Sequence, residues 1–161
     1  MKKLFKISTI LICSILIIGF TSCSSSRGTT TKISKGNISN TWTVSDVYLE
    51  GFPSGYEVKN VFDLAPYQDF KGSTWKLYGG NSGMITLTDG TTQNIYWSLV
   101  NDGLNPIFQF KKIDSGEKAK DVNAGYQLDI AASTKNSLTL RSPFKLLNGN
   151  VAYIVYNLVS Q

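Results

Sequence analysis

Residues 84–100 read MITLTDGTTQNIYWSLV, two runs of alternating apolar and polar residues joined by Asp89-Gly90. Side chains alternate between the two faces of a β-strand, so this pattern predicts two half-buried strands. Asp-Gly is a dipeptide favoured in the two-residue turns that join antiparallel strands. The stretch therefore predicts a hairpin in which Ile95 and Trp97 share one face.

Similar runs recur about every ten residues on both sides of this hairpin, which is typical of an antiparallel all-β domain. In the first run, a bulge after Val44 shifts the alternation to Val47. One short helix is predicted from Pro66 to Lys71, because Pro66 suits a first helical position and Gly72 follows the end. The other predicted strands are Thr41 to Glu50, Ser73 to Tyr78, Ile107 to Ile113, Tyr126 to Ile130, Ser137 to Ser142, Val151 to Val159, and a weaker one near Tyr56 to Phe62.

About eight sequential strands joined by hairpins predict a small antiparallel up-and-down β-barrel, with a β-sandwich as the alternative. The last run is apolar on both faces, from Val151 to Val159. Such a strand needs a partner on each side, which a closed sheet provides. The barrel is therefore the favoured fold.

The N-terminus has the pattern of an export signal, with Lys2, Lys3 and Lys6 before an apolar segment too short to cross a bilayer. Residues 19–23, Gly-Phe-Thr-Ser-Cys, resemble the lipobox of bacterial lipoproteins, in which the cysteine is lipidated. This pattern predicts a signal peptide at residues 1–22 and a membrane anchor on Cys23. A Ser/Thr-rich linker then covers residues 23–35, and the folded domain covers residues 36–161.

The linker also bears on localisation. It contains no acidic residue, unlike the acidic export tags typical of Bacteroidetes surface lipoproteins. We therefore expect the protein in the cell envelope, as an outer-membrane lipoprotein that faces the periplasm.

Two segments carry a resemblance to a known family. Residues 37–42, ending in Trp42, resemble the lipocalin-like start of the first strand, and residues 69–77 resemble the second-strand segment of lipocalin-like lipoproteins of the Bacteroidetes type. Asn40 stands where the family has glycine, and Arg141 lies one strand earlier than the family's arginine. The resemblance implies a lipocalin-like barrel that serves as a binding or accessory module.

Composition removes several classes of function. The chain has no histidine, which excludes imidazole bases, Ser-His-Asp sites and most zinc sites. Asp63 and Asp69 flank the short helix and could form a carboxylate pair for glycoside chemistry, but helix capping and turn formation are far commoner roles of aspartate. Loss of three signal lysines leaves 13 basic against 11 acidic residues. We therefore expect no enzyme, no cofactor, no metal and no nucleic-acid partner.

The mature chain is rich in aromatic residues, with three Trp, eight Tyr and six Phe. Trp42 is expected to close the barrel base, against either an apolar partner or Arg141 through a cation–π contact. The leading hypothesis is a small apolar or amphipathic ligand inside the barrel. The alternative is an accessory lipoprotein that docks on another envelope protein. The predicted ligand-binding wall is Trp75, Trp97, Phe108, Phe110 and Tyr126.

Overall fold

The computed structural model describes residues 33–101, 106–120, 122 and 125–161. The expected signal peptide, Cys23 and most of the linker lie outside these residues. Eight antiparallel strands form a closed barrel in the order β1 to β8, so the predicted up-and-down barrel is confirmed and the sandwich alternative is wrong. The strands are β1 Thr41–Glu50, β2 Thr74–Leu77, β3 Ser82–Thr86, β4 Thr92–Asn101, β5 Pro106–Lys112, β6 Tyr126–Ser133, β7 Ser137–Lys145 and β8 Val151–Ser160.

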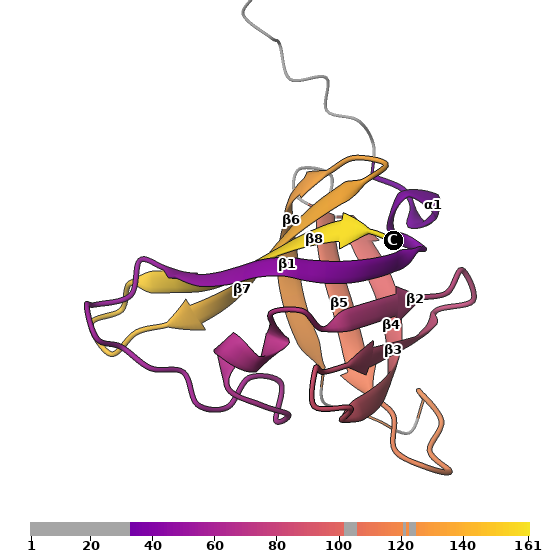
Figure 1. The fold of residues 1–161 in the computed structure, drawn as a ribbon, viewed down its shortest axis with the longest axis horizontal. Coiled ribbons are helices and arrows are strands. Elements are labelled where there is room, and N and C mark those ends of the chain that lie inside the picture. The colour runs from indigo at the N-terminus through magenta and orange to yellow at the C-terminus, as the bar shows by residue number, and fades with distance from the viewer. Residues whose placement is uncertain (1–32, 102–105, 121, 123–124) are drawn as a thin grey trace, which may run out of the picture. The chain divides into compact units, whose positions relative to one another are not determined.

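The barrel closes where the first strand pairs with the last. Residues of β1 from Trp42 to Glu50 face residues of β8 from Ser160 to Tyr153. The apolar character of both faces of β8 is thereby explained, because β8 has a neighbour on each side. Figure 1 shows β1 and β8 side by side along the barrel.

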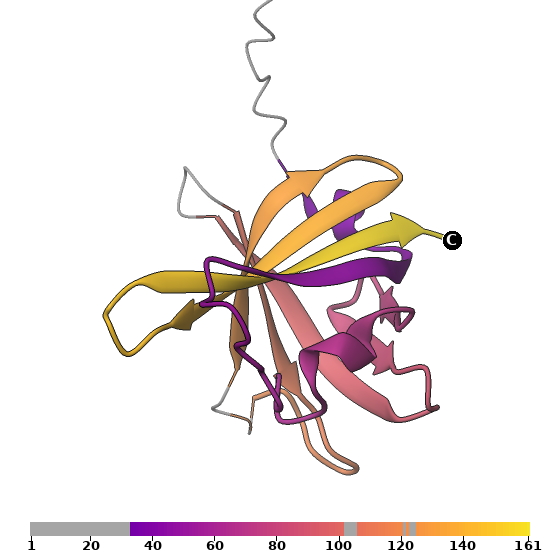
Figure 2. The same cartoon turned by 60° about the vertical axis from the view of Figure 1, so that its left-hand side comes forward.

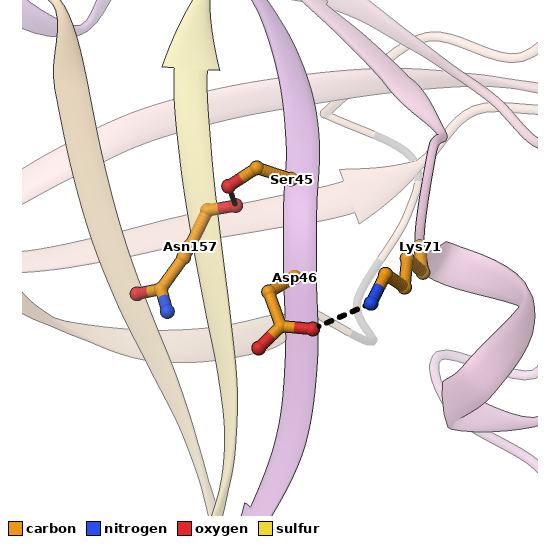
Figure 3. Close-up of polar contacts among 4 residues, drawn as sticks. All are labelled: Ser45, Asp46, Lys71 and Asn157. Carbon is orange, nitrogen blue, oxygen red and sulfur yellow. Dashed lines mark hydrogen bonds and ion pairs between the residues drawn. The ribbon is translucent and has the colours of Figure 1, made fainter.

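The predicted bulge in β1 is confirmed. The register shifts between Val44 and Asp46, so Trp42 and Val44 are buried before the shift and Val47 is partly buried after it. Ser45 turns toward β8, where its hydroxyl donates to the Asn157 carbonyl at 2.9 Å (Figure 3). Asp46 pairs with Lys71 at 2.9 Å, and this hydrogen bond lowers the pKa of the exposed carboxyl.

The hairpin at Asp89-Gly90 is confirmed, but its loop has three residues, Thr88 to Gly90, in place of the expected two. Gly90 adopts a φ of 89°, and the Leu87 amide donates to the Thr91 carbonyl at 2.8 Å. The Asp89 carboxylate accepts from the Thr91 amide at 2.8 Å, which lowers the pKa of Asp89. Local turn chemistry thus fixes the register between β3 and β4.

Two helical elements flank the first strand. The helix expected at Pro66 to Lys71 is the 3₁₀ helix η1, Tyr67–Phe70, which ends before Gly72 with its φ of 83°. A second helix, α1 at Lys35–Ile38, was not predicted. It begins one residue before the expected start of the domain. Within the described residues, no helix combines the length and apolarity needed to cross a membrane.

The strand predicted near Tyr56 to Phe62 is wrong. This part of the chain belongs to a long connection from Gly51 to Ser73, in which residues 56–62 take part only in the isolated bridge between Val61 and Ala65. Its apolar residues are buried because the connection packs against the barrel interior, and not because they alternate in a strand. In Figures 1 and 2 this connection lies between the β7–β8 hairpin on one side and strands β2 and β3 on the other.

Candidate binding site

The site begins where two neighbouring strands part. β6 pairs with β7 only as far as Asp129 and Arg141, and the outer half of β7, which contains Pro143, pairs with β8 alone. Proline has no amide proton and cannot extend a ladder on that side, which suits it to a sheet edge. Figures 1 and 2 show the β7–β8 hairpin diverging from the lower part of β6. We call this opening the barrel mouth.

A pocket of about 380 Å³ lies in the barrel mouth. This volume is within the range of small-molecule sites. Its polar groups come from Asn60, Gln127 and Ser142, and its wall is otherwise largely apolar. We call it the mouth pocket, and it is lined by Val58, Asn60, Val61, Phe62, Gly125, Tyr126, Gln127, Ser142, Pro143, Phe144 and Ile154.

Phe62 separates the mouth pocket from the barrel interior. Its backbone is left-handed with a φ of 57°, as is that of Asp63 with a φ of 49°. Non-glycine residues rarely adopt this conformation, and two in succession turn the chain sharply. The turn directs the Phe62 ring inward, where only 6% of the residue is exposed. The ring lies among Phe70, Trp75, Phe110, Tyr126 and Tyr156, with centroid distances of 5.0 to 6.3 Å.

Asp63 ties this turn to the barrel. The Tyr126 hydroxyl donates to Asp63 Oδ2 at 2.7 Å, and the Lys112 ammonium donates to the Asp63 carbonyl at 3.0 Å. Desolvation and the Asp63 carboxylate raise the pKa of Tyr126 from 10.0 to about 12. The hydroxyl therefore stays protonated and continues to donate well above neutral pH. Lys112 of β5 and Tyr126 of β6 thus hold the Phe62 turn in place.

Replacement of Tyr126 by phenylalanine is expected to lower the free energy of unfolding by about 1 kcal/mol, because one hydrogen bond to a carboxylate is lost at a partly exposed site. Urea denaturation at neutral pH measures this difference. Folding raises the pKa of Tyr126, so the contribution is present below about pH 10 and is lost as the pH rises toward about 12. If the difference in unfolding free energy between the wild type and Tyr126→Phe stayed constant from about pH 10 to about pH 12, the assigned hydrogen bond would be contradicted.

The structure brings four of the five predicted ligand-binding residues into one buried aromatic cluster. Trp75, Trp97 and Phe108 are fully buried and Phe110 is 2% exposed. Trp97 stacks on Phe108 with a centroid distance of 5.8 Å, and the ring centroids of Phe110 and Trp75 lie 6.2 Å apart. Tyr126, the fifth, is partly buried and is the one member that lines the mouth pocket.

Phe110 and Tyr126 also border a second hollow, of about 350 Å³. Its other residues include Tyr96, Gln109 and Lys111, which alternate with the inward-facing residues of β4 and β5. Most of the lining of this hollow therefore lies on the outer surface of the sheet.

Phe62, Phe144 and Tyr156 belong to the site and were not predicted. Tyr156 could have been found, because it shares the inward face of the last strand with Ile154 and Leu158. Phe62 carries no such signal, since its burial depends on the left-handed turn.

The opposite end of the barrel is closed by α1. Trp42 Nε1 donates to the Ile38 carbonyl at 2.9 Å, and Ile38 is fully buried. The predicted contact between Trp42 and Arg141 is wrong. Arg141 lies 3.9 Å from the centroid of the Tyr153 ring and forms an ion pair with Glu50. Of the two partners expected for Trp42, the structure has the apolar one, Ile38.

Turn residues also seal this end. Trp97 Nε1 donates to the Ser82 and Tyr78 carbonyls at 3.0 and 3.1 Å. Asn81 Nδ2 donates to the Trp97 carbonyl at 2.7 Å, and Lys35 Nζ lies 5.7 Å from the centroid of the Trp97 ring. A ligand would therefore enter through the barrel mouth.

Asp63 and Asp69 are both exposed, and the contacts of Asp63 are those that fix the Phe62 turn. In the part of the chain that the structure describes, no three His, Cys, Asp or Glu side chains gather to hold a metal. No protein family, curated protein or solved structure matches the chain. A functional proposal therefore rests on the geometry of the barrel mouth.

Proposed function

We propose that this protein is a non-enzymatic, membrane-anchored lipoprotein that binds a small apolar or amphipathic molecule at the barrel mouth. The observation that carries the proposal is the mouth pocket of about 380 Å³, which opens where β6 and β7 part. Phe144 and Ile154 supply apolar wall, and Gln127 and Ser142 supply polar groups at the same opening. A pocket whose wall combines apolar and polar groups is suited to an amphipathic ligand.

A binding measurement on wild-type protein and the Phe144→Ala variant tests this proposal. Phe144 is partly exposed and packs on Phe52 and Tyr56 at 5.5 and 6.1 Å, so its loss should remove pocket wall without opening the buried core. We expect anilinonaphthalene sulfonate, an amphipathic fluorophore, to bind the wild type and to be displaced by host lipid extract. Phe144→Ala should weaken its binding about tenfold, the effect of losing about 1.4 kcal/mol of contact.

Tyr48→Ala provides the matched control. Tyr48 is an exposed aromatic residue of β1 that does not line the mouth pocket. Its removal should leave the affinity unchanged. Equal losses in the two variants, or fluorophore binding that lipid extract does not reduce, would contradict a site at the barrel mouth.

Membrane attachment is proposed to depend on the lipid at Cys23. Two or more acyl chains hold a protein on a bilayer nearly permanently, whereas the barrel need not touch lipid. The Cys23→Ser variant is expected to move from the membrane fraction to the soluble fraction. Cell fractionation followed by a high-salt wash measures this change, and a variant that still sediments with membranes would contradict the anchor.

Docking on another envelope protein is the second candidate function. One observation favours it: Leu147 is wholly exposed at the tip of the β7–β8 hairpin, and Val151 beside it is 51% exposed. Exposed apolar side chains on a projecting element are suited to protein contact. Cross-linking to an envelope protein that is lost in Leu147→Ser, together with no effect of Phe144→Ala on any binding, would favour docking over a ligand.

A further inference from the structure

We infer that the Phe62 ring occupies a ligand subsite inside the barrel, and that the ligand presents there a flat ring bearing a neutral hydrogen-bond acceptor such as a carbonyl. This inference rests on the proposed function and specifies the chemistry of the ligand. Phe62 belongs to a short turn that adjoins the mouth pocket, whereas its aromatic neighbours belong to the barrel or to η1. The side chain that fills this space is therefore the one that can leave it.

The space around Phe62 is built for a ring. We call it the ring box, and Phe70, Phe110 and Trp75 present themselves to Phe62 at interplanar angles of 87°, 78° and 74°. Tyr156 stacks on it at 29° with a centroid distance of 5.9 Å. Edge-to-face and stacked contacts of this kind are favourable for any aromatic ring of similar size. A ligand ring could therefore replace Phe62 with the same contacts.

The Tyr156 hydroxyl points to the second element of the ligand. Tyr156 is fully buried, and no group among the described residues accepts a hydrogen bond from its hydroxyl. A buried donor without a partner is unfavourable and rare in folded proteins. Phe62 has no polar atom and cannot satisfy it. A ligand that replaces Phe62 and carries an acceptor can.

The acceptor must be neutral. Burial raises the pKa of Tyr156, so its hydroxyl keeps its proton and is available to donate. The rings that form the ring box carry no charge, so a carboxylate placed there would be buried without a cation. A carbonyl on a ring meets both conditions. The apolar remainder of such a molecule would extend into the mouth pocket.

The turn that holds Phe62 lies outside the strand pairing of the barrel, so it can move without breaking the sheet. The left-handed backbone at Phe62 and Asp63 is unfavourable for residues with side chains. Within the turn, the Val61 amide donates to the Ala65 carbonyl at 2.8 Å, and the Leu64 amide donates to the Val61 carbonyl at 3.0 Å. Withdrawal of Phe62 would break the Asp63 contacts with Tyr126 and Lys112, relieve the left-handed backbone and open the ring box to the mouth pocket.

Two probes of equal shape test the inference. Acetophenone and isopropenylbenzene have the same skeleton, but only acetophenone carries a carbonyl. In calorimetric titrations, the Phe62→Ala variant should bind acetophenone more tightly than isopropenylbenzene. The ratio of these two affinities should be about tenfold higher in Phe62→Ala than in Phe62→Ala/Tyr156→Phe. The difference in hydrophobicity between the two probes affects both variants equally, so it cancels when the two ratios are compared. Wild-type protein should bind acetophenone more weakly than Phe62→Ala does, because Phe62 competes for the same space.

A second measurement covers the case in which Phe62→Ala does not fold. Phe62→Leu keeps most of the apolar volume and should bind acetophenone more tightly than the wild type. In the wild type, saturating acetophenone should shift the NMR signals of the Phe62 ring and the Tyr156 hydroxyl.

Three outcomes would overturn the inference. One is an affinity ratio that Tyr156→Phe leaves unchanged, and another is the absence of any shift at Phe62 under saturating probe. The third is fluorophore binding that depends on Phe144 while neither Phe62 nor Tyr156 responds to any ring probe. That result would leave the proposed function in place and remove only the ring subsite.

Discussion

Replacement of Trp97 by alanine is expected to lower the free energy of unfolding by about 3 to 5 kcal/mol, the range for a buried large aromatic residue. Trp97 is fully buried and stacks on Phe108 at 5.8 Å. Its Nε1 also donates to the Ser82 and Tyr78 carbonyls, which joins β4 to the turn between β2 and β3. Small domains are stable by only about 5 to 15 kcal/mol, so the variant should unfold well below the urea concentration that unfolds the wild type.

Tyr96→Ala is the matched control for this prediction. Tyr96 is the neighbour of Trp97 in β4, faces the opposite side of the sheet and is 39% exposed. Its replacement should cost less than about 1 kcal/mol, as is usual for surface positions. Urea melts of both variants give the comparison. A Trp97→Ala midpoint close to that of the wild type would mean that the ring lines a cavity and is not part of a packed core.

The barrel could be predicted from sequence because its signals are local. Alternation places Trp97, Phe108 and Phe110 on inward faces, and the structure buries all three. The bulge after Val44 and the turn at Asp89-Gly90 were also readable, since each is determined by a few adjacent residues. Closure followed from the apolar faces of the last strand, which could not be left at an edge.

The barrel mouth could not be predicted because it depends on contacts between distant residues. Val58 and Phe62 indicated a strand, yet they are buried by a connection that folds back over the open end of the barrel. The left-handed backbone at Phe62 and Asp63 has no signature in residue type, as glycine would have provided. The helix α1 has four residues, too few for a helical period to be seen.

Where the strands part was equally hidden. Pro143 marks a position that can lack a partner, but the sequence does not show that β6 diverges there. The five residues predicted to bind ligand were chosen as inward-facing aromatics, and inward-facing aromatics are also what a packed core requires. Tyr126 lines the mouth pocket because β7 does not pair with this part of β6, and that is a property of the assembled sheet.

Replacement of Tyr156 by phenylalanine is expected to raise the free energy of unfolding, by about 1 to 3 kcal/mol, because it removes a buried donor that lacks a partner. Tyr156 is fully buried, and its ring would keep the contacts at 5.8 and 5.9 Å with Phe70 and Trp75. Urea denaturation at neutral pH measures the gain. It should increase above about pH 10, because burial raises the pKa of Tyr156 and the wild type alone then loses stability.

The sign of this effect decides between two roles for the hydroxyl. A stabilising Tyr156→Phe means that the wild-type residue is unfavourable for the empty barrel and is compensated only when an acceptor enters the ring box. The advantage of this variant over the wild type should then shrink in the presence of saturating acetophenone, since the probe binds more tightly to the protein that can donate to it and stabilises that protein more. A destabilising Tyr156→Phe would show that the hydroxyl already has a partner in the folded chain. The ring box would then be packing alone, and the barrel mouth would bind its ligand without a donor from β8.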